Sequence, residues 1–158
     1  MILTLTIAFT IVFADQLIKH LIRRMPEGIV LFQADPLFEI IPCTNSGAAF
    51  SVFSGYPKLL AMISIVLLAA VTIAICRYTR LSYSGRISYA MLLGGGMGNL
   101  IDRLLFGGVT DYIRLQFISF PVFNLADIAI TISVITMILL ILIGKIDIYT
   151  GDAHESNH

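Results

Sequence analysis

The chain has 158 residues, of which 58% are hydrophobic and 13% are charged, and its ten basic and ten acidic side chains give a formal net charge of zero. Soluble domains usually carry about 25% charged residues, so this composition predicts a membrane protein. The absence of a basic excess argues against a nucleic-acid-binding protein. The two cysteines, Cys43 and Cys76, are too few for a disulfide framework, and we expect both thiols to be free.

The first predicted element is a membrane helix over residues 2–22. Its first half is almost wholly apolar, and Leu17, Ile18 and Leu21 extend the pattern. The run reaches the length of about 20 residues that a bilayer-spanning helix needs. Because no basic segment precedes the run and no cleavage site of small residues follows it, we do not expect a signal peptide.

The connection over residues 23–57 is the longest that we predict between two helices. Its stretches IVLF and LFEIIP have the composition of β-strands and are interrupted by Pro36 and Pro42. We therefore predict a small β-ribbon near the outer interface of the membrane. A structureless loop of this length would be unusual unless it were functional.

Three further apolar segments predict membrane helices over residues 59–76, 87–106 and 122–144. All four spans should be helical, because backbone amides in hydrocarbon must be satisfied within their own segment. Four spans place both termini on one side, and the three arginines between the second and third spans favour the cytoplasm for that side. We predict an all-α membrane protein with a periplasmic β-ribbon, as a single domain over residues 1–158.

Two pairs of residues lie one helical turn apart. Asp15 and Lys19 share a helix face, either as a structural ion pair or as a pair that orients or electrostatically tunes a nearby site. Gly94 and Gly98 form a small-xxx-small pair that lets another helix approach closely. A phosphate-binding loop is disfavoured here, because the stretch GGGMGN lacks a Lys-Ser/Thr ending and lies within an apolar segment.

Three polar residues follow these glycines. Asn99, Asp102 and Arg103 have the spacing i, i+3 and i+4, so they should project from one side of the third helix near its outer end. We expect Asp102 and Arg103 to form a local ion pair, or a pair with partners on other helices.

The two remaining intramembrane candidates are Asp111 and Asp127. Gly107 and Gly108 permit a tight turn that folds the connector with Asp111 back toward the helices. Asp127 follows Asn124 by three residues in the first turns of the fourth helix. A deep carboxylate can take up a proton or share one with another carboxylate. Two carboxylates that share a proton can activate water and protonate a carbonyl oxygen, as in aspartic peptidases.

Other chemistries fit the sequence less well. No serine lies in a G-x-S-x-G elbow, and the three histidines have no zinc-ligand spacing. A magnesium site built from Asp102, Asp111 and Asp127 is conceivable, since Mg²⁺ prefers carboxylate oxygens. The adjacent Arg103 argues against it, and we expect neither a metal nor another cofactor.

Five motifs in chain order resemble the bacterial lipoprotein signal peptidase, signal peptidase II, of aspartic peptidase family A8. They are DQLIK, NSGAAFS, GNLIDR, VTDYI and FNLAD, which begin at residues 15, 45, 98, 109 and 123. One departure is Ser46, where the family commonly has threonine, and this change keeps the hydroxyl. The resemblance implies an inner-membrane peptidase that removes signal peptides just before a diacylglyceryl-modified cysteine.

The resemblance also implies roles for individual residues. The catalytic pair falls on Asp111 and Asp127. The supporting residues fall on Asp15, Lys19, Asn45, Gly47, Asn99, Asp102, Arg103 and Asn124. The long first loop would be a β-rich cradle on the outer leaflet, and the active site would face the periplasm. The expected partners are a lipidated prolipoprotein and membrane lipids, and we expect a monomer that binds no nucleic acid.

Two hypotheses from other classes remain open at this stage. A small proton or ion carrier would use Asp15, Lys19 and Asp127 as a relay, and it predicts charge movement in liposomes without any peptide. A non-catalytic assembly subunit would pack through Gly94 and Gly98, and it predicts that the aspartates are dispensable.

Overall fold

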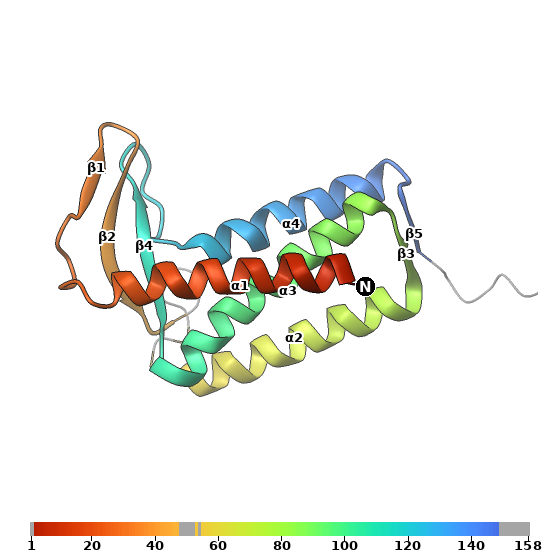
Figure 1. Cartoon of the computed structure of the whole chain (residues 1–158), viewed down its shortest axis with the longest axis horizontal. Helices are drawn as coiled ribbons and strands as arrows, with labels where there is room; N and C mark the ends of the chain where they lie inside the picture. The colour runs from red at the N-terminus through yellow and green to blue at the C-terminus, as the bar shows by residue number, and fades with distance from the viewer. Residues whose placement is uncertain (1, 48–52, 54, 149–158) are drawn as a thin grey trace, which may run out of the picture.

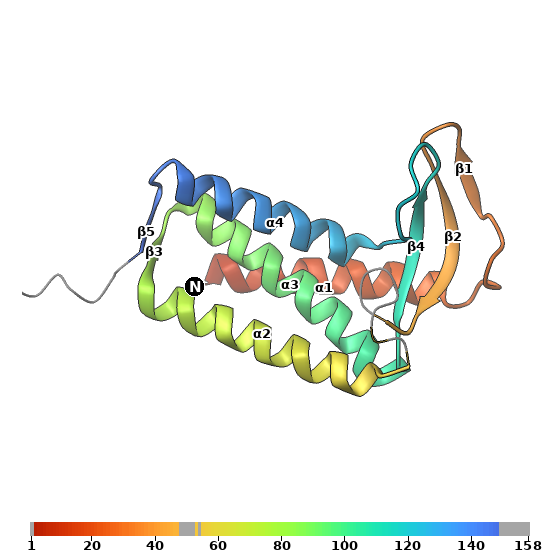
Figure 2. The ribbon, with the colours of Figure 1, turned by 180° about the vertical axis from the view of Figure 1, so that it is seen from behind.

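The computed structural model describes residues 2–47, 53 and 55–148. Within them, four helices lie side by side along the long axis of the molecule, a three-stranded sheet lies at one end, and a short strand pair lies at the other (Figure 1). The start of the first helix and the last described strand lie at the same end, which is the end opposite the three-stranded sheet (Figure 2).

The helices occupy the four predicted apolar segments. They are α1 (Ile2–Ile22), α2 (Pro57–Tyr78), α3 (Tyr83–Phe106) and α4 (Leu125–Leu142). Helix α3 is central, because it contacts each of the other three.

Two predicted helix starts need correction. We placed the third start at residue 87, but α3 begins at Tyr83, because the Ser82 side chain caps it by accepting a hydrogen bond from the Gly85 amide. We placed the fourth start at residue 122, but α4 begins at Leu125 behind the N-cap Asn124. Helix α3 ends at Gly107, which adopts the left-handed conformation at φ 72° that glycine tolerates, as the predicted turn requires.

The helices carry apolar side chains outside and polar ones inside. Phe9 is 70% exposed and Leu142 is 75% exposed, whereas the largest fully buried side chains are Lys19, Asn124, Asp15, Asp102 and Ser133. This arrangement is the reverse of a soluble protein and suits a lipid surrounding. Among the described residues, α1, α4 and residues 57–77 of α2 are long and apolar enough to cross a membrane.

Glycines occupy the faces of helix α3 where its neighbours pack. A Cβ added to Gly98 would lie 2.5 Å from a carboxylate oxygen of Asp15, and one added to Gly94 would lie 2.8 Å from the backbone oxygen of Ala8. Both neighbours belong to α1, so the predicted close packing at these two glycines is confirmed.

The three-stranded sheet contains more than the predicted ribbon. Strands β1 (Phe32–Ala34) and β2 (Phe38–Asn45) come from the first loop, and β4 (Val109–Leu115) adds a third antiparallel strand in the order β1-β2-β4. The sequence interpretation treated the segment of β4 as a plain connector. It also treated Pro42 as a strand interruption, but Pro42 lies within β2, where the register with β4 shifts between Ile40 and Cys43.

The opposite end of the molecule is closed by a second, short sheet. Strand β3 (Thr79–Leu81), which follows α2, pairs antiparallel with β5 (Ile146–Ile148), which follows α4. The stretch GKIDIYTGDAHESNH, from residue 144 onward, predicts a solvated tail, but Ile146 is buried in this pair. The rest of that expectation falls on residues 149–158, which lie outside the described residues.

Candidate active site

Asp111 lies on β4 with its side chain buried between two asparagines. Its exposed fraction is 3%. Asn45, at the end of β2, donates its side-chain amide to one carboxylate oxygen at 3.1 Å, and Asn124 donates to the other at 2.6 Å. Strand β4 delivers the aspartate to this point because it pairs with β2 and places Thr110 and Asp111 directly after the turn that ends α3.

Asp127 is the third residue of α4 and belongs to its N-terminal cap. The Asn124 side chain accepts a hydrogen bond from the Asp127 amide at 2.9 Å, and Asp127 accepts one from the Asn124 amide at 3.1 Å. This reciprocal capping box fixes the position of the carboxylate relative to the helix axis. The other carboxylate oxygen of Asp127 accepts a hydrogen bond from the Asn99 side chain of α3 at 2.7 Å.

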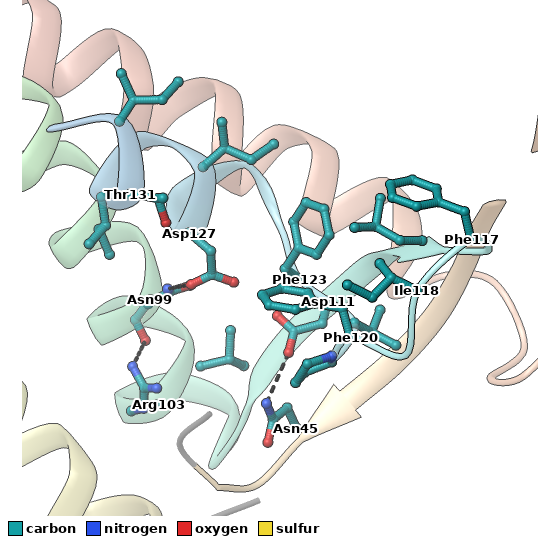
Figure 3. Close-up of a pocket in the computed structure, with 17 residues that line it drawn as sticks. Asn45, Asn99, Arg103, Asp111, Phe117, Ile118, Phe120, Phe123, Asp127 and Thr131 are labelled. Atoms are coloured by element: carbon teal, nitrogen blue, oxygen red, sulfur yellow. Dashed lines mark hydrogen bonds between the residues drawn. The ribbon is translucent and has the colours of Figure 1, made fainter. Parts of the chain in front are cut away.

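Both aspartates line one cavity of about 610 Å³, as Figure 3 shows. Asn99 and Arg103 of α3 lie along one side of it. Apolar side chains of the segment between β4 and α4, including Phe117 and Phe120, lie on the other side. The cavity therefore joins two carboxylates, a guanidinium group and an apolar wall.

The side-chain oxygen of each of the three asparagines accepts a hydrogen bond. Lys19 donates to Asn99 at 2.8 Å, the Asp127 amide donates to Asn124, and the Gly47 amide donates to Asn45 at 3.0 Å. A donor can approach only the oxygen of a side-chain amide, so each NH₂ group must point the other way. All three NH₂ groups are therefore aimed at the carboxylates of Asp111 and Asp127.

The environment of Asp111 changes its acidity. Burial raises the pKa of its carboxyl from 3.8 to about 6, the nearby charge of Asp127 adds to this rise, and the amides of Asn45 and Asn124 oppose it. An aspartate with this pKa keeps its proton at a pH where an ordinary aspartate has lost it.

Asp15, Lys19 and Asp102 form a fully buried charge cluster behind the asparagines. The Lys19 ammonium lies 2.8 Å from Asp15 and 3.5 Å from Asp102. Of the two arrangements left open for Asp102, the pairing with another helix is the one that forms, because its ion pairs are with Lys19 of α1 and with Arg23, which directly follows α1. The cluster therefore holds α1 against α3 directly behind Asn99.

Asp102 also fixes the start of β4. It accepts a hydrogen bond from the Thr110 amide at 2.9 Å, and Arg23 donates to the Thr110 hydroxyl at 3.0 Å. Gln16 donates to the same carboxylate at 3.0 Å. These contacts anchor the residue next to Asp111, so Asp102 acts on the site through the backbone of β4.

The first three amides of α4 are each capped by a different part of the chain. The Tyr112 hydroxyl of β4 accepts from Leu125 at 3.1 Å, and Asp15 of α1 accepts from Ala126 at 3.1 Å. Asn124 accepts from Asp127, as described above. A carboxylate at a helix N-terminus is favoured by the helix dipole, so Asp15 stabilises the end of α4 that carries Asp127.

Arg103 and Gly47 have lesser contacts within the site. Arg103 donates to the Asn99 backbone oxygen at 3.4 Å, and its buried Nε finds no hydrogen-bond partner among the described residues. The Gly47 amide donates a hydrogen bond to the Asn45 side chain and so fixes its orientation.

Sequence reasoning missed four residues that support the site, namely Gln16, Arg23, Thr110 and Tyr112. Their partners are distant in the chain, and no spacing signal identified them. The N-cap role of Asn124 could have been found, because Asn followed by Asp three residues later is a common helix-start pattern.

The arrangement suits acid–base chemistry at a carbonyl group. Two carboxylates with different surroundings face one cavity, and the donors around them carry no charge of their own. Asp102 faces Lys19, Arg23 and Gln16 instead of the cavity, and no group of three or more potential metal ligands occurs in the described part of the chain. The charged side chains that are buried among the described residues, Asp15, Lys19, Glu39, Asp102 and Asp111, lie on the three-stranded sheet or toward the ends of α1 and α3 that adjoin it, which does not favour the ion-carrier hypothesis.

Comparisons with known proteins identify relatives of this chain. The profile of the family described as signal peptidase (SPase) II matches residues 7–143. Proteins named lipoprotein signal peptidase from Nostoc punctiforme and Dehalococcoides mccartyi are 37% and 34% identical over 134 and 149 residues. These matches cover 84% of both chains in the first case, and 92% of this chain and 91% of the relative in the second.

Solved structures give the same result for the fold. A bacterial membrane enzyme determined by the in meso method superposes with a TM-score of 0.82 at 29% identity, covering 98% of this chain and 93% of that one. A second bacterial membrane enzyme superposes with a TM-score of 0.78 at 31% identity, covering 88% and 92%. With these matches, and with apolar helices arranged for a lipid surrounding, the chain belongs to the signal peptidase II family and is a multi-pass peptidase of the bacterial inner membrane.

Proposed function

We propose that this protein is an aspartic endopeptidase that removes signal peptides from diacylglyceryl-modified prolipoproteins, and that Asp111 and Asp127 are its catalytic residues. The observation that carries the proposal is the placement of both carboxylates on one cavity, with asparagine NH₂ groups aimed at each. The relatives named lipoprotein signal peptidase support this choice of substrate.

In the proposed mechanism the two aspartates share one proton and hold a water molecule between them. The ionised carboxylate takes a proton from the water as its oxygen attacks the carbonyl carbon. The protonated carboxyl donates to the carbonyl oxygen and stabilises the tetrahedral intermediate. When the intermediate collapses, the carboxyl that took the proton from water gives it to the departing nitrogen, which leaves as the new N-terminal amine. The hydroxyl formed from the carbonyl oxygen returns its proton to the other aspartate, which restores the pair.

The surrounding residues hold this pair in place. Asn45, Asn99 and Asn124 keep the carboxylates in position without adding charge. Asp15, Lys19 and Asp102 fix the asparagines and the two elements that carry the aspartates. Arg103, beside the cavity, is free to hold a backbone carbonyl of the substrate.

The proposed orientation places the three-stranded sheet and the active site toward the periplasm. All four helices cross the membrane in this proposal, including α3, whose glycine-rich faces are covered by α1 and α4. The substrate enters from the lipid with its lipidated cysteine near the outer surface, where water reaches the aspartates. The proposed site needs no second copy of the chain, because both aspartates and the asparagines that contact them come from the same chain.

The proposal is tested by offering the purified protein a diacylglyceryl-modified prolipoprotein and its unlipidated form. We expect cleavage of the lipidated form immediately before the modified cysteine, and a rate at least about tenfold lower for the unlipidated form, since remote contacts contribute to catalysis. Mass spectrometry of the products identifies the bond. Equal rates for both forms, or a cut elsewhere, contradict the assignment of substrate.

The raised pKa of Asp111 predicts the pH dependence of the reaction. The pair holds its shared proton up to a pH of about 6, because the pKa of Asp111 is raised to about 6. Above that pH the proton is lost and kcat/KM should fall by about tenfold per pH unit. A profile of kcat/KM from pH 4 to pH 9 measures this alkaline limb. A profile that stays flat between pH 6 and pH 9 contradicts the shared proton.

A further inference from the structure

A second cavity of about 430 Å³ adjoins the first one. It is lined by Cys43, Thr44, Asn45, Ser46, Asp111, Pro121 and Val122. Four of these residues, Asn45, Asp111, Pro121 and Val122, also line the larger cavity. Asp111 therefore lies where the two cavities meet.

The two cavities differ in the parts of the chain that enclose them. The larger one is bounded by helices α3 and α4 and by the aromatic segment that includes Phe117 and Phe120. The smaller one lies along the end of β2, where Thr44, Asn45 and Ser46 bring polar groups. The larger cavity thus borders the helices, and the smaller one borders the sheet.

An endopeptidase must hold the polypeptide on both sides of the bond that it cuts. The bond itself has to lie at the aspartates, so the two sides of the substrate must leave Asp111 in different directions. The hydrophobic signal peptide matches the apolar cavity beside the helices. The smaller cavity is then the space that remains for the other side of the substrate.

We propose that the smaller cavity binds the residues that follow the lipidated cysteine, and that Cys43 forms part of its wall. This inference rests on the proposed function. Cys43 pairs directly with Asp111 across β2 and β4, so the two side chains are neighbours on one face of the sheet. A bulky group at Cys43 therefore blocks the mature side of the substrate at its first residues.

The thiol of Cys43 provides a place to attach a blocking group in the smaller cavity. It has no part in the reaction itself. Burial and the charge of Asp111 raise the pKa of this thiol, which disfavours the nucleophilic thiolate. Cys43 is half-buried and lines the cavity, whereas the other cysteine, Cys76, is exposed on α2. The substitution Cys76→Ser leaves Cys43 as the single thiol of the chain.

The test measures how fast the Cys76→Ser protein cleaves two lipopeptide substrates. Both carry the same signal peptide and diacylglyceryl cysteine, but one ends there as an amide and the other continues for six residues. The protein is labelled at alkaline pH with methyl or benzyl methanethiosulfonate. We expect the benzyl adduct to lower kcat/KM at least about tenfold for the long substrate and at most about twofold for the short one. The methyl adduct should have little effect on either.

Controls separate blocking from damage to the fold. Dithiothreitol removes the adduct and should restore full activity, and the Cys43→Ala variant should be insensitive to the reagent. An equal loss for both substrates, or no loss for the long one, overturns the inference while leaving the proposed function intact. Failure of the unlabelled protein to cleave either substrate instead overturns the proposed function.

Discussion

Replacing either Asp111 or Asp127 by asparagine should lower kcat for prolipoprotein cleavage by about 10³-fold or more. Asparagine keeps the size of the side chain but offers one acceptor oxygen instead of two, so one of the two donors that face each carboxylate loses its acceptor. It cannot exchange a proton with water or with the carbonyl oxygen. The loss should therefore appear in kcat, measured on the purified variants with a lipidated substrate.

The matched control for this prediction is Asp35→Asn. Asp35 is exposed in the loop between β1 and β2 and lies outside the cavity, so this variant should cleave at the wild-type rate. All three variants should unfold within a few degrees of the wild-type protein. Turnover by Asp111→Asn or Asp127→Asn at a rate near that of Asp35→Asn would remove both aspartates from the mechanism.

Replacing Lys19 by methionine should destabilise the protein by about 3–5 kcal/mol, because it leaves the buried Asp15 without its ion pair and Asp102 with Arg23 alone. The Lys19 ammonium lies between Asp15 and Asp102, and all three side chains are fully buried. Methionine also removes one of the two donors to the Asn99 oxygen and leaves only the Asn124 amide, so the NH₂ group that faces Asp127 is held by fewer contacts. Denaturant unfolding in detergent measures the loss of stability.

Two companion variants separate this effect from a general sensitivity of α1. Arg24→Met removes an exposed charge from the end of the same helix and should cost less than about 0.5 kcal/mol. Adding Asp15→Asn to Lys19→Met should restore part of the lost stability, because it removes the charge left unpaired at Asp15 and keeps an acceptor for Ala126. A Lys19→Met protein as stable as Arg24→Met contradicts the role of the buried cluster.

The helices were predictable because long apolar runs have few alternatives in a membrane protein. The first prediction, residues 2–22, coincides with α1. The start of α4 was predicted three residues too early, since Val122 and Phe123 extend the apolar run although Asn124 caps the helix. Hydropathy thus locates helices but does not locate their caps.

Strand β4 was not predictable from its own residues. It is a seven-residue stretch that mixes polar and apolar side chains, and it is recognised as a strand only through its pairing with β2. The contacts that support the site were not predictable for the same reason, because they join residues from different elements. Lys19 and Asn99 are 80 residues apart, and their contact depends on how α1 and α3 are rotated against each other. Residue spacing suggested which side chains matter, but it could not show which ones touch.

The capping of α4 has a consequence for engineering. Three separate parts of the chain accept hydrogen bonds from the amides of its first turn. This turn therefore cannot unwind or shift along its axis without breaking all three hydrogen bonds. The first turn of α4, which carries Asp127, is therefore unsuited to redesign. Phe117, Ile118 and Phe120 are between 50% and 67% exposed and take no part in these hydrogen bonds, so new selectivity is best sought there.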